Sequence, residues 1–226
     1  MSDNNKNNDN KKSATNTMTD RELLSEWEID NLPNRLTIFR VALIPVICLT
    51  LYLCLFEENI FKATQKTLGY IAAWTFVAAS FTDFLDGYIA RKRNIVTVFG
   101  SFLDPIADKF LVVSSLILLQ SLNRVNVLVV IVLVIREMYM TALRLLAMEK
   151  GLKVSVNQLG KWKTTFQMMA IPMLMAWDKP FGFSFPLVGT ILIYLSFFFS
   201  VLSALVYTFG LGKRITEVRQ AKKAKI

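Results

Sequence analysis

The chain has 226 residues and a formal net charge of +9, and 54% of its residues are hydrophobic while only 19% are charged. Soluble domains are less apolar and more highly charged; the apolar residues here form long blocks, which indicates a membrane protein. The absence of histidine excludes catalytic and metal sites built on imidazole. The two cysteines, Cys48 and Cys54, lie in one apolar block and predict no disulfide framework.

The N-terminal part of the chain differs from the rest in composition. Residues 1–19 are rich in Asn, Lys, Ser and Thr and are predicted to be a disordered cytoplasmic tail. Residues 20–33 alternate acidic and apolar positions near helical spacing, which predicts an amphipathic helix lying at the membrane interface. We expect Pro33 to end this helix and to turn the chain into the membrane.

Six apolar blocks follow, and most of them reach the ~20 residues that a helix needs to cross a bilayer. The blocks cover roughly residues 36–56, 69–90, 98–120, 125–147, 164–178 and 185–210. The sequence therefore predicts an all-α integral membrane fold, with six transmembrane helices over residues 34–211, the N-terminal interfacial helix before them, and a basic cytoplasmic tail at 212–226.

The connections between these blocks differ in charge. Alternate connections, at 91–97, 149–163 and 212–226, carry thirteen Lys and Arg residues, whereas the opposite set carries four. Basic loops remain on the cytoplasmic side of a membrane, so we expect both termini to be cytoplasmic. The same asymmetry accounts for most of the positive charge without a nucleic-acid partner.

Four aspartates lie at the cytoplasmic ends of the second and third blocks. At 100° per residue, the charged and small residues of each block fall on one helix face, and two antiparallel helices would bring the two faces together. The faces contain Asp83, Asp86, Gly87 and Ala90 on the first helix, and Gly100, Asp104 and Asp108 on the second.

Four converging carboxylates repel one another unless a cation compensates their charge. Oxygen ligands without nearby His or Cys favour Mg²⁺ or Mn²⁺, and two such ions would suit a displacement at phosphorus. The small residues would let a ligand approach the helix backbone. The alternative interpretation is a set of interfacial charges that cap helices and pair with the basic residues at 91–93.

The pattern Asp83-x2-Asp86-Gly87-x2-Ala90-Arg91-x8-Gly100-x3-Asp104-x3-Asp108 resembles the signature of the CDP-alcohol phosphotransferase family at every fixed position. The resemblance implies a six-helix membrane fold, commonly a homodimer, with its active site at the cytoplasmic surface. It also implies transfer of a phosphatidyl-type group from a CDP-linked lipid to an alcohol, with release of CMP.

The resemblance also implies a role for each matching residue. Asp83, Asp86 and Asp104 would bind a first metal ion, and Asp83, Asp104 and Asp108 a second, with Asp108 as the general base. The positions near the CDP group would be Asn34, Thr37, Gly87, Ala90, Arg91 and Thr97. For Asn34 and Thr37, capping of the first transmembrane helix is an alternative role.

A second group of charged residues indicates which acceptor alcohol the protein would bind. Arg136 and Arg144 fall on similar sides of the fourth predicted helix, and Lys161 and Lys163 begin the fifth. Together these cations would bind a phosphate dianion, because guanidinium groups match phosphate oxygens; alternatively, they extend to lipid headgroups. Glu137 would then neutralise a neighbouring arginine.

The segment 135–169 and the opening of the first helix resemble the bacterial phosphatidylglycerophosphate synthases of that family, over roughly residues 30–210. This resemblance implies CDP-diacylglycerol as the donor, sn-glycerol 3-phosphate as the acceptor, and a location in the bacterial cytoplasmic membrane. The alternatives within the family are phosphatidylinositol-phosphate synthase and cardiolipin synthase. Outside it, a cation transporter would tend to show internal repeats or broken helices, which the sequence lacks.

Overall fold

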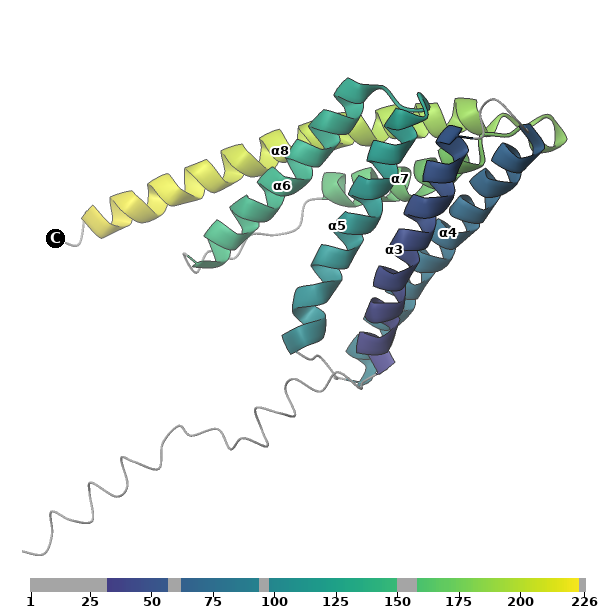
Figure 1. Cartoon of the computed structure of the whole chain (residues 1–226). Helices are drawn as coiled ribbons and strands as arrows, with labels where there is room; N and C mark the ends of the chain where they lie inside the picture. The colour runs from purple at the N-terminus through teal and green to yellow at the C-terminus, as the bar shows by residue number, and fades with distance from the viewer. Residues whose placement is uncertain (1–31, 57–61, 94–97, 150–157, 224–226) are drawn as a thin grey trace, which may run out of the picture.

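The computed structural model describes residues 32–56, 62–93, 98–149 and 158–223. Within these ranges the chain is helical apart from short turns at 122–126, 177–179 and 183–184, and it contains no strands (Figure 1). The elements are α3 (Leu32–Phe56), α4 (Lys62–Arg93), α5 (Val98–Ser121), α6 (Val127–Glu149), α7 (Gln158–Ala176), the short 3₁₀ helix η2 (Pro180–Gly182) and α8 (Phe185–Lys223). The predicted tail at 1–19 and nearly all of the predicted interfacial helix at 20–33 lie outside the described residues.

Each of the six predicted apolar blocks lies largely within one helix, so the all-α prediction is confirmed. Among the described residues, three helices are long and apolar enough to cross a membrane, over Arg35–Phe56, Thr64–Leu85 and Phe185–Lys213. The other three carry several charged residues, such as Lys109, Arg136 and Lys163, which set them apart from ordinary membrane spans. The structure thus confirms three membrane-type helices among its described residues, and the six-span topology stays a prediction.

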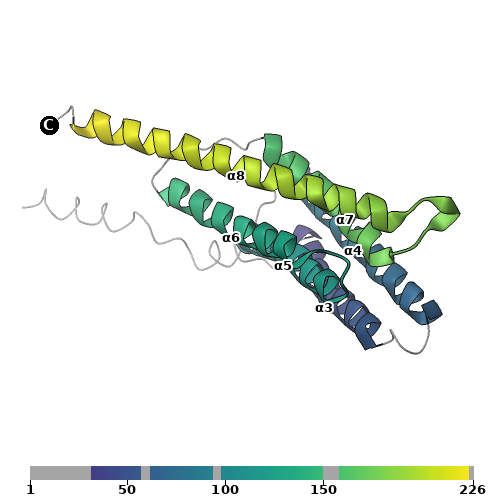
Figure 2. The same ribbon diagram turned by 90° about the horizontal axis from the view of Figure 1, so that it is seen from above.

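The helices α3, α4 and α5 run side by side, and α7 and α8 pack along each other (Figures 1 and 2). The beginning of α3, the end of α4 and the beginning of α5 lie together at the lower end of Figure 1. The core between the helices contains fully or almost fully buried side chains, among them Leu51, Phe76, Leu111, Leu133 and Leu174. This core fixes which ends of the helices meet.

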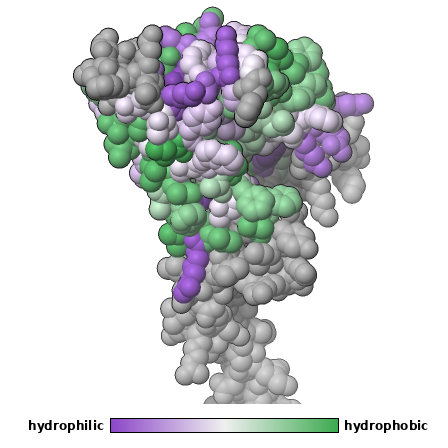
Figure 3. Space-filling model, turned by 90° about the vertical axis from the view of Figure 1, so that its right-hand side faces the viewer, coloured by the Kyte–Doolittle hydropathy of each residue, from purple (hydrophilic) through white to green (hydrophobic). Residues whose placement is uncertain are grey.

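The outer surface of the bundle is unusually apolar. Trp74, Leu128 and Phe209 are 69%, 68% and 74% exposed, and apolar residues cover much of the side seen in Figure 3. Large apolar surface of this extent marks a contact with lipid or with another protein rather than with water. The surface therefore agrees with a membrane protein.

The turn between α5 and α6 is specified by two asparagines. Asn123 adopts a left-handed conformation with φ 57°, and the amides of Asn123 and Arg124 donate to the carbonyls of Gln120 and Leu119 at 2.8 and 2.9 Å. This is the pattern of a Schellman cap, in which asparagine substitutes for glycine. Asn126 Oδ1 then accepts from the amide of Leu128 at 2.9 Å and caps the start of α6.

Arg124 joins this turn to the end of α7. Its Nη1 donates to the carbonyls of Leu174 and Met175 at 3.0 and 2.6 Å, two groups that the last helical turn leaves without a partner within the helix. The guanidinium carbon also lies 5.4 Å from the centroid of the Trp177 ring. A buried arginine therefore stabilises the end of the bundle opposite the aspartates.

The same end contains an exposed ionic cluster around Asp178. Asp178 Oδ2 accepts from Tyr70 Oη at 2.7 Å and pairs with Lys66 Nζ at 2.8 Å. Hydrogen bonds from Lys66, from Tyr70 and from the backbone at Lys179 lower the pKa of the Asp178 carboxyl from 3.8 to about 2. Asp178 thereby links the loop after α7 to the first turns of α4.

Candidate active site

The structure brings the first and last aspartates of the motif together. Asp83 on α4 and Asp108 on α5 each place Oδ1 near the same atom, Arg40 Nη1, at 2.9 and 2.6 Å. Arg40 lies on α3 and its side chain is completely buried, whereas the two aspartate side chains are 38% and 37% exposed. Three consecutive helices therefore contribute to one ionic centre.

The other two motif aspartates, Asp86 and Asp104, have described backbones but not described side chains. Both lie in regular helix, on α4 and α5, as the helical faces in the sequence predicted. Among the side chains that the structure does describe, no three carboxylate or thiol groups lie close enough to hold a metal ion. The metal-ligand set thus stays a prediction.

The predicted CDP-contact residues are described to different extents. Thr37 is buried on α3, one turn before Arg40. The backbones of Asn34, Gly87, Ala90 and Arg91 are helical, but their side chains fall outside the described set. Thr97 lies entirely outside the described residues, so its predicted contact stays a prediction.

A cavity of about 240 Å³ extends from Asp108 toward α6 and α7. Three of its charged lining residues were predicted from the sequence: Asp108 as the base, and Arg144 and Lys163 as acceptor-phosphate ligands. Lys109 and Glu137 also line it. The structure therefore places the candidate base and two candidate phosphate ligands around one space.

Glu137 organises the cations beside this cavity. Its Oε1 accepts a short hydrogen bond from Lys163 Nζ on α7, and Arg136 Nη1 lies 3.3 Å from the same oxygen. The side chains of Arg136 and Lys163 are 9% and 4% exposed. A buried charge is tolerated only with a partner of opposite charge, and Glu137 is that partner for both cations.

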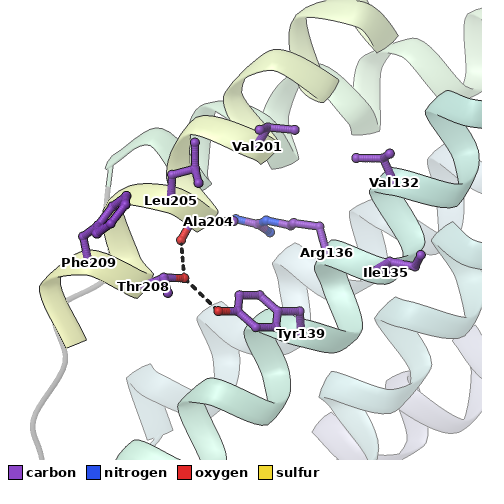
Figure 4. Close-up of a pocket in the computed structure, with 9 residues that line it drawn as sticks. All are labelled: Val132, Ile135, Arg136, Tyr139, Val201, Ala204, Leu205, Thr208 and Phe209. Carbon is purple, nitrogen blue, oxygen red and sulfur yellow. Dashed lines mark hydrogen bonds between the residues drawn. The ribbon is translucent and has the colours of Figure 1, made fainter. Parts of the chain in front are cut away.

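Arg136 points away from the cavity beside Asp108. Its Nε donates to the carbonyl of Ser200 at 3.2 Å and its Nη2 donates to Ser203 Oγ, both on α8. It lines a separate, mainly apolar cavity of about 340 Å³ between α6 and α8, where Tyr139 and Thr208 share a hydrogen bond of 3.0 Å (Figure 4). The structure thus separates Arg136 from Arg144 and Lys163.

Lys161 is exposed at the start of α7 and does not line the cavity. Arg144 is also exposed but contributes to the cavity wall. The four cations that sequence spacing grouped together therefore occupy three environments: two at the cavity, one between α6 and α8, and one at the surface.

Sequence reasoning did not single out Arg40. The signal was present, because an arginine within an otherwise apolar transmembrane block is a default indication of a functional or paired residue. The motif drew attention to the second and third blocks, and the first block contributes no carboxylate. Only the packing of α3 against α4 and α5 shows that Arg40 reaches Asp83 and Asp108.

Comparison with known proteins agrees with this geometry. The family model for CDP-alcohol phosphatidyltransferase matches residues 30–202. The chain is 40% identical over 181 residues to the CDP-diacylglycerol–glycerol-3-phosphate 3-phosphatidyltransferase of Bacillus subtilis. This alignment covers 78% of the chain and 93% of the relative. The chain is 42% identical over 180 residues to the protein of the same name from Rickettsia bellii, with 79% and 93% covered.

A third relative carries a different name. The chain is 40% identical over 193 residues to a cardiolipin synthase (CMP-forming) from Oryza sativa, covering 78% of this chain and 56% of the rice protein. All three relatives have a similar sequence identity to this chain, but their names differ. Sequence identity therefore distinguishes the acceptor alcohol less sharply than the donor chemistry. The match of the family model over most of the chain, together with these relatives, shows that this chain belongs to the CDP-alcohol phosphatidyltransferase family.

Proposed function

We propose that the chain transfers a phosphatidyl group from CDP-diacylglycerol to sn-glycerol 3-phosphate, giving phosphatidylglycerophosphate and CMP. The observation that carries the proposal is the cavity beside Asp108, because it combines a carboxylate with Arg144 and Lys163. A phosphorylated alcohol needs both features: a base near its hydroxyl and cations near its phosphate. The bacterial relatives carry the name of this reaction.

Asp108 is the candidate general base for this reaction. Its carboxylate would take the proton of the acceptor hydroxyl while the hydroxyl oxygen forms a bond to the lipid-linked phosphorus. The bond from that phosphorus to the CMP oxygen breaks, and CMP leaves. Arg40 holds one oxygen of Asp108, which fixes the direction of the carboxylate during the transfer.

Two described carboxylates support the proposal of a divalent metal site. Asp83 and Asp108 are oxygen donors that contact the same Arg40 nitrogen and remain partly exposed, and carboxylate oxygens suit Mg²⁺ or Mn²⁺. We propose that Asp86 and Asp104 complete the set, for two ions in all. Such ions would neutralise charge on the phosphates of the donor.

Arg144 and Lys163 are the candidate ligands of the acceptor phosphate, with Lys109 on the facing wall. Their charges would favour a dianion over an uncharged alcohol. We assign Arg136 a supporting role, because it contacts the cavity only through Glu137. Lys161, at the exposed start of α7, would attract the anionic acceptor without holding it.

We further propose that all six helices cross the bacterial cytoplasmic membrane, with both termini and the active site on the cytoplasmic side, and that the protein forms a homodimer. Two observations support the topology. The helices α5, α6 and α7 have 24, 23 and 19 residues, close to the length of a membrane span. Their charged residues include the candidate site residues Asp108, Arg144 and Lys163, and the basic connections lie at the C-terminal ends of α4, α6 and α8 in the sequence.

An acceptor assay tests the function. Purified protein in detergent, with Mg²⁺ and CDP-diacylglycerol, is expected to release CMP when glycerol 3-phosphate is added and to lose this activity in EDTA. CMP release with inositol phosphate, but not with glycerol 3-phosphate, would reject the proposed acceptor. Reconstituted protein with CMP release at only one membrane face would test the orientation.

Cardiolipin synthesis is the second candidate, because the rice relative carries that name. Its acceptor would be phosphatidylglycerol, whose phosphate is a diester with a single charge. The cavity cations favour the monoester, so we expect glycerol 3-phosphate to exceed phosphatidylglycerol as acceptor by at least ~10-fold, the scale of one lost charged hydrogen bond. The reverse order would support the second candidate.

A further inference from the structure

Arg40 presents a geometric asymmetry at the aspartate centre. Its side chain has no exposed surface, while the side chains of Asp83 and Asp108 are more than one third exposed. A single nitrogen, Nη1, contacts Oδ1 of both aspartates. The guanidinium therefore contacts the two carboxylates from the buried interior, and each carboxylate side chain keeps an exposed surface, which we call its open side.

Burying the charged side chain of Arg40 costs free energy that apolar packing alone does not offset. Burying an arginine side chain requires a compensating charge, and an arginine in an apolar span is unfavourable without one. The two carboxylates are also unfavourable without a cation, because their like charges repel each other. Each group thus stabilises the other, and α3 is tied to α4 and α5 by charge as well as by apolar packing.

We propose that Arg40 is a positioning residue for the metal site: from the buried side it holds Asp83 and Asp108 next to each other, so that a divalent cation binds at their open side. The inference rests on the proposed metal-dependent function. It assigns Arg40 no contact with substrate. The cation and Arg40 would occupy opposite sides of the same carboxylates, so Arg40 need not leave when the metal binds.

Two other roles are distinguishable from this one. Arg40 as a purely structural residue would affect folding stability but not metal affinity. Arg40 as a substitute for the metal would compete with it, so that its removal would tighten metal binding. A positioning residue has the opposite effect, because loss of an outer partner of metal ligands typically weakens metal affinity 10- to 100-fold.

The test is a titration of the full chain with Mn²⁺ in detergent, after treatment with EDTA, with free Mn²⁺ followed by electron paramagnetic resonance. We expect Arg40→Gln to weaken Mn²⁺ binding roughly 10- to 100-fold. Arg40→Lys keeps the charge but not the planar fork, and its affinity should lie between those of the wild type and Arg40→Gln.

Arg124→Gln is the matched control. Arg124 is also a buried arginine, but it contacts the carbonyls of Leu174 and Met175 at the other end of the bundle. We expect this variant to lose thermal stability and to bind Mn²⁺ as the wild type does. A loss of affinity in Arg124→Gln equal to that in Arg40→Gln would show a general effect of destabilisation and would overturn the inference.

Further outcomes separate the inference from the proposed function. Mn²⁺ binding by Arg40→Gln that equals or exceeds wild-type binding overturns the positioning role alone. No Mn²⁺ binding by the wild type overturns the metal-dependent function and the inference with it. Should Arg40→Gln fail to fold, Arg40→Lys decides: an affinity equal to that of the wild type overturns the role, and a weaker one supports it.

Discussion

Lys163 on α7 and Glu137 on α6 form an ion pair at the wall of the cavity that begins at Asp108. The pair is separated by 26 positions in the sequence, and the segment that connects its two helices includes the basic loop. Because Arg136 contacts the same carboxylate oxygen, Glu137 compensates two cations. The ion pair therefore determines both the stability of this region and the direction of Lys163.

Glu137→Gln should reduce the stability of the protein. The substitution keeps the shape of the side chain but leaves Arg136 and Lys163, both nearly buried, without a compensating charge. We expect a loss of about 2 kcal/mol or more, because breaking a buried ion pair costs several kcal/mol and Glu137 is itself partly exposed. In a protein of this size this lowers the midpoint of thermal unfolding by roughly 5 °C.

Glu149→Gln is the control for this prediction. Glu149 lies at the exposed end of the same helix, and surface substitutions usually change stability by less than about 0.5 kcal/mol. Thermal unfolding of both variants in the same detergent provides the measurement. Equal midpoints for the two variants would show that Glu137 does not compensate the buried cations.

Asp108→Asn should fold but turn over at least ~100-fold more slowly, the usual scale for loss of a general base. Asparagine cannot take the proton of the acceptor hydroxyl. Arg40 keeps its contact with Asp83 at 2.9 Å, so we expect only a modest change in the unfolding midpoint. CMP release under saturating substrates measures the turnover, and near-normal turnover would remove Asp108 from this role.

We expect unequal effects on the KM for the acceptor from Arg144→Ala and Lys161→Ala. Arg144 lines the cavity beside Asp108, whereas Lys161 is exposed outside it. We expect Arg144→Ala to raise the KM for glycerol 3-phosphate by about 10-fold or more, on the scale of a lost charged hydrogen bond, with the KM for CDP-diacylglycerol unchanged. Lys161→Ala should change either KM by less than about threefold, as a surface charge does.

Steady-state assays with each substrate varied in turn would check this pair of predictions. If Arg144→Ala raised both KM values equally, the effect would be one of folding and not of acceptor binding. If Lys161→Ala had the larger effect, the acceptor phosphate would lie nearer to the membrane surface than the cavity places it.

The lowered pKa of Asp178, at the end of the bundle opposite the motif aspartates, predicts that the stability of the protein depends on pH. Its pKa is lowered from 3.8 to about 2 in the folded chain, so the folded state favours the ionised form. The stabilisation is present above pH ~4 and is lost as the pH falls through about 2. The midpoint difference between wild type and Asp178→Asn should therefore be constant above pH ~5 and should shrink below pH ~4.

Thermal unfolding of both proteins from pH 6 to pH 2 measures this difference. Because Asp178 contacts the first turns of α4 and Asp83 lies near the other end of that helix, CMP release at neutral pH should not change. A midpoint difference that is independent of pH would mean that the contacts of Tyr70 and Lys66 do not depend on the charge of Asp178.

Local signals in the sequence predicted much of the fold. The apolar blocks gave the helices, since a segment that can bury its backbone only by forming internal hydrogen bonds becomes helical in lipid. Sequence reasoning did not single out Asn123 and Asn126, which mark the end of α5 and the start of α6, although asparagine tolerates the left-handed conformation and caps helices.

The helical phase of the motif likewise predicted that Asp83 and Asp108 would lie together. The four-aspartate motif itself was sufficient to indicate the family, since its residue types and spacing are both local properties of the chain. The candidate acceptor residues were predictable only as a group of cations, because periodicity places residues on a helix face without specifying which neighbouring helix that face meets.

Tertiary structure decided the rest. Arg40 reaches the aspartates only because α3 packs against both α4 and α5, and Arg136 turns toward Ser200 and Ser203 because α8 lies beside α6. Ionic partners distant in sequence have no local signature, since their interaction depends on the distance between helices. The sequence by itself determined the helices and the candidate carboxylates, and the packing decided which cations lie beside them.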